Sequence, residues 1–268
     1  MKKTVFICTG LLFSAATFTT KVFATENLVF VHGAHFNAES WKQVSGSLSS
    51  NIQPVLLDLP GRMESENAEI ITLSSSAKSL CREIKALEGN IHFAAHSQGG
   101  AIVNQAVGLC PSNQFQSITY VTAVAPQQGE TAFGSLSKQD EANYFEGVRY
   151  NETSHRMVIG DSAKFAETFA QDANEKQKNI LQRLSLSEPA HIAEEKVAFE
   201  PSNMERIKKH YVFASNDKII SLESQLKIAK NAQIKSVYAM QTGHLPMLTD
   251  SEGLARILNS IVLYPSQK

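Results

Sequence analysis

Hydrophobic residues are concentrated in short runs, and longer segments with a periodic hydrophobic face lie between those runs. In the first half of the chain the short runs cover residues 27–32, 54–59, 90–95 and 118–124. The intervening segments space their hydrophobic residues three or four positions apart, as amphipathic helices do, and cover residues 38–50, 72–88 and 99–109. Continuous hydrophobic runs indicate strands buried on both faces. The alternation therefore predicts an α/β fold, in which helices cover both faces of a doubly wound, mostly parallel sheet.

The alternation stops between residues 127 and 205, where the sequence becomes more polar. This stretch predicts helical pieces joined by loops, without a convincing parallel strand. The alternation then resumes with strands at 210–214 and 235–240 and helices at 221–231 and 251–263. Because residues 127–205 lack the hydrophobic periodicity for a core of their own, a helical cap inserted into one domain is favoured over a second independent domain.

The first 24 residues differ from the rest of the chain. Lys2 and Lys3 precede a hydrophobic stretch over residues 5–18, and Val22 and Ala24 are small residues at the spacing of a signal-peptidase site. The stretch is short for a membrane span. Residues 1–24 are therefore interpreted as a cleaved export signal, with a retained anchor as the alternative. We expect the mature chain, residues 25–268, to be periplasmic or secreted.

The numbers of acidic and basic residues are almost equal, which argues against a nucleic-acid partner. The chain has 268 residues, of which 25 are Lys or Arg and 26 are Asp or Glu, and its formal net charge is −1. It contains no basic run and no alternation of basic and aromatic residues, the pattern of nucleic-acid-binding proteins. We expect a small-molecule substrate, no nucleic-acid partner, and no membrane association after signal cleavage. The oligomeric state cannot be predicted from these features.

Two cysteines remain after signal cleavage, Cys81 and Cys110. Both belong to predicted helices on the same side of the sheet. In an oxidising compartment an even number of cysteines favours a disulfide. Two separate buried thiols fit the sequence equally well, because sequence does not give the distance between the Cα atoms.

The pentapeptide AHSQG (95–99) lies where a predicted buried strand gives way directly to a predicted helix. A serine at such a junction, between small residues two positions away, is typical of the nucleophile elbow of a serine hydrolase. Ala95 and Gly99 provide the small residues that so sharp a turn requires. The turn presents the hydroxyl of Ser97 at the carboxyl edge of the sheet. Ser97 is therefore the candidate nucleophile.

A serine nucleophile needs main-chain donors for the oxyanion that forms when it attacks a carbonyl. One donor is expected from the N–H group that follows the nucleophile, which belongs to Gln98. The other is expected from the loop after the first strand, HGAHF (32–36), in which the N–H group of Ala34 is the candidate. Phe36, in the same loop, is expected to border the substrate pocket.

The acid and the base are expected after the serine in the order serine, acid, histidine. Of the eight histidines, His244 lies in TGHLP (242–246), directly after the last predicted strand and before the final helix. Asp217 lies in ASNDK (214–218), just beyond the preceding strand. Both positions are at the carboxyl edge of the sheet that also holds Ser97. The sequence therefore predicts a Ser97–His244–Asp217 catalytic triad.

With these residues identified, the chain resembles the α/β-hydrolase superfamily. The resemblance is closest to the branch of plant methylesterases, hydroxynitrile lyases and their bacterial esterase relatives. The segments that support it are LVFVHGAHFNAESWKQV (28–44), LLDLPGR (56–62), HSQGGAIV (96–103), VFASNDKIISLESQ (212–225) and TGHLPMLTDSEGL (242–254). The resemblance implies a parallel-sheet core, a cap over the site, and neither a metal nor an organic cofactor.

Two departures favour ester hydrolysis over cyanohydrin cleavage. Hydroxynitrile lyases of this branch carry a threonine in the first-strand loop and a lysine directly after the catalytic histidine. Gly33 and Leu245 occupy these positions here and supply neither group. The expected activity is hydrolysis of small carboxylic esters. The alternatives are a hydroxynitrile lyase, a carbon–carbon hydrolase, or a ligand-binding member with little turnover.

The sequence does not identify the natural ester or the cap residues that contact it. Phe165 and Phe169 occur at helical spacing in the cap. They either line the pocket or pack between helices.

Overall fold

The computed structural model describes residues 24–264. Apart from Ala24, the predicted signal peptide lies outside the described residues. No helix within residues 24–264 has the length and hydrophobicity to cross a membrane.

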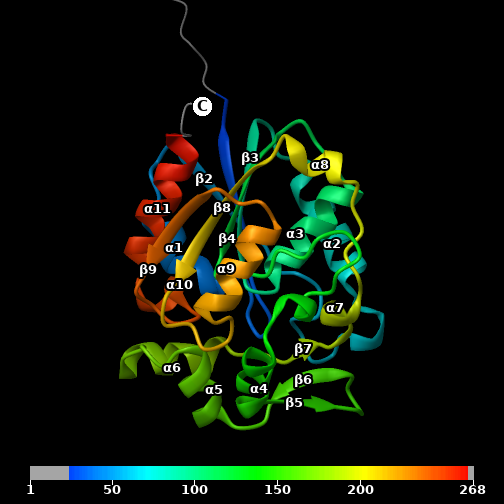
Figure 1. Ribbon diagram of the computed structural model, residues 1–268, viewed down its shortest axis with the longest axis vertical. Coiled ribbons are helices and arrows are strands. Elements are labelled where there is room, and N and C mark those ends of the chain that lie inside the picture. Colours follow the sequence, from blue (N-terminus) through cyan, green and yellow to red (C-terminus); the bar gives the residue numbers. More distant parts are fainter. Residues whose placement is uncertain (1–23, 265–268) are drawn as a thin grey trace, which may run out of the picture.

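A parallel sheet of six strands forms the centre of the molecule, in the order β2-β1-β3-β4-β8-β9 (Figure 1). Its strands are β1 (Glu26–Val31), β2 (Ile52–Leu56), β3 (Asn90–His96), β4 (Phe115–Val121), β8 (Lys208–Ala214) and β9 (Ser236–Met240). The inner strands β1, β3, β4 and β8 are buried over nearly their whole length, as their continuous hydrophobic sequences require. The predicted fold class is confirmed.

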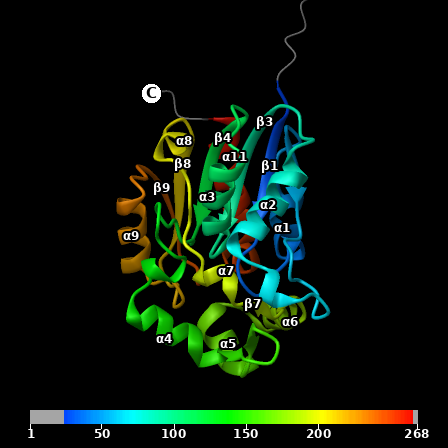
Figure 2. The same cartoon turned by 90° about the vertical axis from the view of Figure 1, so that its right-hand side faces the viewer.

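Helices cover both faces of the sheet (Figures 1 and 2). One face carries α2 (Leu73–Ile84), α3 (Gly99–Leu109) and α9 (Leu222–Asn231). The other carries α1 (Lys42–Gly46), which follows the 3-10 helix η1 (Ala38–Trp41), and α11 (Ser251–Leu263). The chain passes from β1 outward to β2 and then back across β1 to β3, so right-handed crossovers place the helices on opposite faces.

The reversal of direction between β1 and β3 is the topological switch point of the sheet. The loops leaving the carboxyl ends of two such strands diverge, which leaves a crevice between them. The loop after β1 begins at His32, and the turn after β3 contains Ser97. The fold therefore brings the predicted first-strand loop and the predicted nucleophile to one crevice.

Several expected elements differ in their bounds. The strand expected over 118–124 is paired over Phe115–Val121, and the helix expected over 72–88 spans Leu73–Ile84. The run predicted as a strand over 54–59 is paired only over Ile52–Leu56. The chain then leaves the sheet because Asp58 accepts a hydrogen bond from the Ala38 main chain (2.8 Å) and the Leu59 N–H donates to the His32 ring (3.2 Å). The helix expected over 38–50 is shorter, since η1 and α1 end at Gly46.

Most of the segment predicted as the cap lies across the carboxyl edge of the sheet, but its last helix, α8 (Pro201–Glu205), lies at the opposite edge and packs on α3 (Figures 1 and 2). The segment contains η3 (Phe133–Ser135), α4 (Lys138–Gly147), α5 (Ser162–Phe169), α6 (Glu175–Leu184), α7 (His191–Glu194) and α8. It also contains a small antiparallel sheet of β5 (Val148–Asn151), β6 (Arg156–Ile159) and β7 (Glu188–Pro189). The expectation of helices and loops alone was therefore incomplete.

A disulfide joins Cys81 and Cys110, whose Cα atoms are 5.9 Å apart. Cys81 lies in the last turns of α2, and Cys110 directly follows α3. Because both helices run back from the carboxyl edge, the bridge lies at the amino edge of the sheet, opposite the crevice. The sequence left open whether these cysteines are bridged, and the structure shows that they are.

Candidate active site

Ser97 occupies the turn between β3 and α3 in a strained backbone conformation, with φ of 52°. Only tight packing sustains a left-handed conformation at a residue other than glycine. That packing requires glycines after the serine: a Cβ atom on Gly99 would lie 2.7 Å from the Val31 carbonyl oxygen, and one on Gly100 only 2.0 Å from the Val124 carbonyl oxygen. The nearest atoms to a Cβ on Gly99 belong to the main chain at the end of β1, which explains why a small residue is required there.

His244 and Asp217 lie beside Ser97 as the sequence predicted. The Nε2 atom of His244 is 3.0 Å from the Ser97 hydroxyl oxygen, and its Nδ1 atom is 2.7 Å from Oδ2 of Asp217. Since Nδ1 donates to the carboxylate, Nε2 is left as the acceptor that faces the hydroxyl group. Both side chains are fully buried. The geometry is that of a nucleophile, a base and an orienting acid.

Four donors fix the carboxylate of Asp217. Besides His244, these are the main-chain N–H groups of Ile219 (2.7 Å) and Ile220 (2.9 Å) and the hydroxyl group of Thr122. Thr122 follows β4 and has a φ of 38°. The sequence analysis missed Thr122, because nothing in the local pattern distinguishes it from an ordinary threonine at a strand end.

The two predicted oxyanion donors border the same small cavity as Ser97. The residues Ala34, Ser97 and Gln98 all line it. Within residues 24–264, neither the Ala34 nor the Gln98 N–H group donates a hydrogen bond. Both are therefore free to bind an oxyanion.

His32 fixes the orientation of one of these donors. The Leu59 N–H donates to His32 Nε2, so the ring hydrogen is on Nδ1 and is donated to the Gly33 carbonyl oxygen (3.1 Å). Burial, aided by the positive charge of Arg62, lowers the pKa of His32 to about 4, so the ring is neutral. The carbonyl of Gly33 and the N–H of Ala34 belong to one planar peptide and point in opposite directions. The ring therefore turns the Ala34 donor away from His32.

His96 contacts both the main chain and the ring of His244. Its Nε2 atom donates to the His244 carbonyl oxygen (2.9 Å), and the two ring centroids are 4.7 Å apart. Burial and the nearby His244 hold the pKa of His96 well below its usual range. A neutral His96 leaves His244 as the imidazole that can gain a proton from Ser97.

The cavity at Ser97 is small and mainly apolar, at about 30 Å³. Besides the elbow and loop residues, its lining consists of Val124, Ala132, Phe133, Leu136, Tyr144, Phe169, Ile219 and Ile220. Phe169 therefore lines the pocket, while Phe165 stacks on it at 4.1 Å between ring centroids without reaching the cavity. The expectation for Phe36 was wrong: its ring faces a separate groove beside α6.

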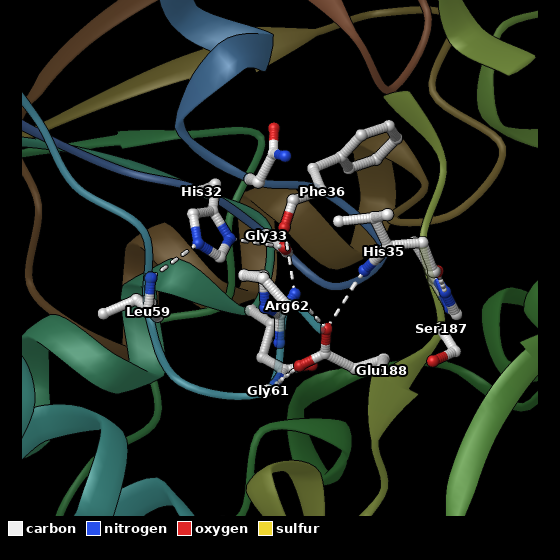
Figure 3. Close-up of polar contacts among 12 residues, drawn as sticks. His32, Gly33, His35, Phe36, Leu59, Gly61, Arg62, Ser187 and Glu188 are labelled. Atoms are coloured by element: carbon white, nitrogen blue, oxygen red, sulfur yellow. Dashed lines mark hydrogen bonds and ion pairs between the residues drawn. The ribbon is translucent and has the colours of Figure 1, made fainter. Parts of the chain in front are cut away.

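A buried ion pair contacts the first-strand loop (Figure 3). The carboxylate of Glu188, on β7, is 2.6 Å from the Arg62 guanidinium and accepts from the His35 main-chain N–H (3.1 Å). Burial alone would raise the pKa of Glu188, but the charge and hydrogen bond of Arg62 hold that pKa below its usual value. Glu188 is therefore an anion that Arg62 neutralises within the core.

His35 adds a second link between the first-strand loop and the cap. Its Nδ1 atom is 2.9 Å from the Leu186 carbonyl oxygen, so Nδ1 donates and Nε2 accepts from the Tyr144 hydroxyl (2.8 Å). Burial lowers the pKa of His35 and raises that of Tyr144 well above its usual value, so both are neutral. The Tyr144 ring is thereby fixed against the cavity.

The cap also contacts the loops that carry the acid and the base. Asp172 accepts a hydrogen bond from the Gly243 N–H (2.7 Å), next to His244. The Gln171 side chain donates to the Asn216 carbonyl oxygen, next to Asp217. Cap residues therefore touch each of the segments that form the site.

The described residues contain no group of three or more His, Cys, Asp or Glu side chains arranged to hold a metal ion.

Solved structures share this arrangement of sheet and cap. A pyrethroid hydrolase from Sphingobium faniae JZ-2 has a TM-score of 0.79 at 16% identity, covering 90% of this chain and 98% of its own. An extracellular α/β-hydrolase from a Paenibacillus species has a TM-score of 0.76 at 19% identity, covering 87% and 97%. A methylesterase protein from Arabidopsis has a TM-score of 0.74 at 16% identity, covering 89% and 99%. At these identities the likeness shows a shared fold.

A comparison with curated protein sequences found none that matches this chain. The family model described as "Alpha/beta hydrolase family" matches residues 28–257, which include the first-strand loop, the serine elbow and the positions of Asp217 and His244. The chain therefore belongs to the α/β-hydrolase family.

Proposed function

We propose that the protein is a serine esterase that hydrolyses small carboxylic esters. The observation that supports this most directly is the continuous contact from the Ser97 hydroxyl through His244 to Asp217, at 3.0 and 2.7 Å. The free N–H groups of Ala34 and Gln98 beside the hydroxyl add the oxyanion hole that acyl transfer requires. A methylesterase and a pyrethroid hydrolase share the fold, which agrees with this class of reaction.

The reaction proceeds by two acyl transfers. The Ser97 oxygen attacks the ester carbonyl carbon while His244 Nε2 takes the hydroxyl proton, and the carbonyl oxygen becomes an anion bound by Ala34 and Gln98. The carbon–alkoxide bond then breaks and His244 protonates the leaving alkoxide. Water repeats the sequence on the acyl-enzyme, with His244 as its base, which releases the carboxylic acid and restores Ser97.

The cavity suggests the chemistry of the acyl group. Apart from Ser97 and Gln98, its lining is formed by aliphatic and aromatic residues, most of them from the segment around η3, from α4 and α5 and from the loop after Asp217. No charged side chain lines it within the described residues, so a carboxylate or ammonium group on the acyl side would be desolvated without a partner. We propose a short, uncharged, apolar acyl group.

A fluorophosphonate probe and a short p-nitrophenyl ester test this proposal together. Purified protein should be labelled at Ser97 and should release p-nitrophenolate, and Ser97→Ala should lose both activities. Ser224→Ala provides a control serine, because that buried residue belongs to α9. If the wild-type protein is not labelled at Ser97 and no ester is turned over, the hydrolase proposal is wrong and a ligand-binding role is favoured.

Two other activities, cyanohydrin cleavage and carbon–carbon bond hydrolysis, would change the assigned reaction without changing the fold. A Cβ atom on Gly33 would lie 2.7 Å from the Ser97 Cβ atom, and Leu245 is only 2% exposed, so neither position accommodates the threonine or lysine of the related lyases. We therefore expect no cyanide release from cyanohydrins. Turnover of a β-diketone with no turnover of esters would instead identify a carbon–carbon hydrolase.

We further propose that the protein is exported after removal of residues 1–24. The Cys81–Cys110 bridge supports this, because disulfides persist in oxidising compartments. Expression of the full chain in a bacterial host, followed by fractionation and N-terminal sequencing, tests it. A mature N-terminus at Thr25 in the periplasm or medium is the expected result, and full-length protein retained in the membrane fraction would favour the anchor.

A further inference from the structure

We propose that Glu188 is a positioning residue that holds the two halves of the oxyanion hole in register; this rests on the function proposed above. The two oxyanion donors belong to separate chain segments, Ala34 to the loop after β1 and Gln98 to the turn after β3. These segments are joined near the cavity through one carboxylate contributed by the cap strand β7.

Each carboxylate oxygen of Glu188 binds one of these segments. Oε2 accepts from the N–H of His35 (3.1 Å), the residue next to Ala34 (Figure 3). Oε1 accepts from the side-chain Nε2 of Gln98 (3.1 Å). Because the carboxylate is rigid and planar, it fixes the distance between the two segments. Movement of either one breaks a hydrogen bond in a site where water does not replace it, since Glu188 is 3% exposed.

Arg62 completes the arrangement. Its Nη1 atom donates to Oε2 of Glu188 (2.6 Å) and to the carbonyl oxygen of Phe36 (2.9 Å), at the far end of the first-strand loop (Figure 3). The guanidinium also neutralises the carboxylate. This matters because an unpaired anion behind the cavity would repel the negative charge that develops on the reacting oxygen. The pair therefore fixes the donors without adding net charge to the site.

The expected effect follows from what oxyanion donors contribute. Loss of one donor in a serine hydrolase lowers kcat by about 10²–10³-fold. Misplacement of both donors without loss of either should lower kcat by roughly ten- to a hundred-fold, with a small change in KM. Donors that meet the oxygen only in the transition state have little influence on substrate binding.

The test compares Glu188→Gln with Glu195→Gln. Glu195 is also a cap carboxylate and accepts hydrogen bonds from the Ser74 main chain (2.8 Å) and hydroxyl group, and neither residue lines the Ser97 cavity. Rates of p-nitrophenyl ester hydrolysis are divided by the number of sites that a fluorophosphonate titrates, so misfolded protein does not count. The inhibition constant of an aryl trifluoromethyl ketone, to which Ser97 adds to give a bound oxyanion, is measured in parallel.

For Glu188→Gln we expect per-site kcat to fall at least ten-fold and ketone affinity to fall by a similar factor, with KM within about two-fold. Glu195→Gln should change these quantities by less than two-fold, whatever it does to thermal stability. Gln98→Met provides a second variant that keeps the Arg62–Glu188 pair and the main-chain N–H, and it should lower per-site kcat at least three-fold.

Three results would overturn the inference. Normal per-site kcat and ketone affinity in Glu188→Gln would show that Glu188 only stabilises the cap. If that variant does not fold, wild-type kinetics in Gln98→Met would do the same. Wild-type protein without labelling or turnover would instead remove the proposed function itself, and with it any role for an oxyanion hole.

Discussion

At the scale of single residues, the crevice around Ser97 contains positions that have room only for glycine. The clearest is Gly33, where a Cβ atom would lie 2.7 Å from the Ser97 Cβ atom and 2.8 Å from a ring nitrogen of His96. Neither neighbour can move freely, since Ser97 is held in a strained turn and His96 is buried. A methyl group at position 33 must therefore displace the loop that holds Ala34.

We expect Gly33→Ala to lower kcat for a short ester by at least ten-fold and the free energy of unfolding by about 1–3 kcal/mol, the usual cost of overpacking. Steady-state kinetics and urea denaturation measure the two effects. Gly46→Ala is the matched control, because a Cβ atom there meets no atom within 4 Å. Equal behaviour of the two variants would contradict the steric explanation.

A second residue-scale prediction concerns His32 and acid stability. The pKa of this histidine is about 4 in the folded protein, below the value of about 6.5 in an unfolded chain. Between these two pH values the unfolded chain binds the extra proton, so the free energy of unfolding falls as the pH falls. The slope is about 1.4 kcal/mol per pH unit, and the loss from His32 amounts to about 3 kcal/mol.

Replacement of His32 by asparagine should remove this contribution. We expect a shallower decline in the free energy of unfolding between pH 6.5 and 4 than in the wild-type protein, measured by urea denaturation at several pH values. An unaltered slope in His32→Asn would refute the assignment of a buried neutral ring.

The residues of the site differ in how far sequence can predict them. Ser97, Asp217 and His244 each lie in a short loop directly after a strand, and parallel strands end at one edge, so their proximity follows from local patterns. Glu188 has no such signal, because it reaches the elbow through a cap whose path depends on tertiary packing. Thr122 is hidden for a similar reason, since its partner is 95 positions away.

At the scale of elements, the cap helix α5 determines the depth of the pocket. Phe169 lies at its carboxyl end and lines the cavity, while Phe165, one turn earlier, packs on the outer side of Phe169. Both rings are almost completely buried. The same helix therefore supplies one residue that lines the cavity and one that supports it.

We expect Phe169→Leu to raise the ratio of propionate to acetate ester hydrolysis by about ten-fold, because one methylene group in an apolar pocket is worth about 1–3 kcal/mol. The ratio of kcat/KM for the two p-nitrophenyl esters measures it. Phe165→Leu should leave the ratio within two-fold of wild type. A larger change in Phe165→Leu than in Phe169→Leu would show that the lining has been misidentified.

Strand and helix positions in the core were predicted closely, and those in the cap were not. A buried strand such as β3 is a continuous hydrophobic run, which sequence reveals directly. In contrast, β5 has two exposed residues and β7 has only two residues, so neither shows the period of a half-buried strand. The run 54–59 was extended too far because hydrogen bonds to Ala38 and His32 end the strand, and these partners are distant in sequence.

At the scale of the whole molecule, the disulfide and the active site lie at opposite edges of the sheet. The bridge joins residues 29 positions apart, so the loss of unfolded-chain entropy stabilises the fold by about 3–4 kcal/mol. For a chain of this size that corresponds to roughly 10 °C in Tm. The bridge touches none of the catalytic loops.

Reduction of the bridge should therefore lower Tm by roughly 10 °C and leave kcat at 25 °C within two-fold of its original value. Differential scanning calorimetry and ester kinetics with and without reductant measure the two quantities. The double variant Cys81→Ser/Cys110→Ser should show the lower Tm in both conditions. A fall in per-site kcat on reduction without a shift in Tm would contradict this separation.

The size of the cavity at Ser97 has a consequence for the timing of turnover. A void of about 30 Å³ holds only one or two water molecules. For the proposed esterase we expect that the cap must shift before an ester larger than this void can enter. The same cap supplies Glu188 to the oxyanion loop, Asp172 to the histidine loop and Gln171 to the aspartate loop, so such a shift would break these hydrogen bonds. We therefore expect kcat for esters to depend on solvent viscosity as well as on the reactivity of the ester.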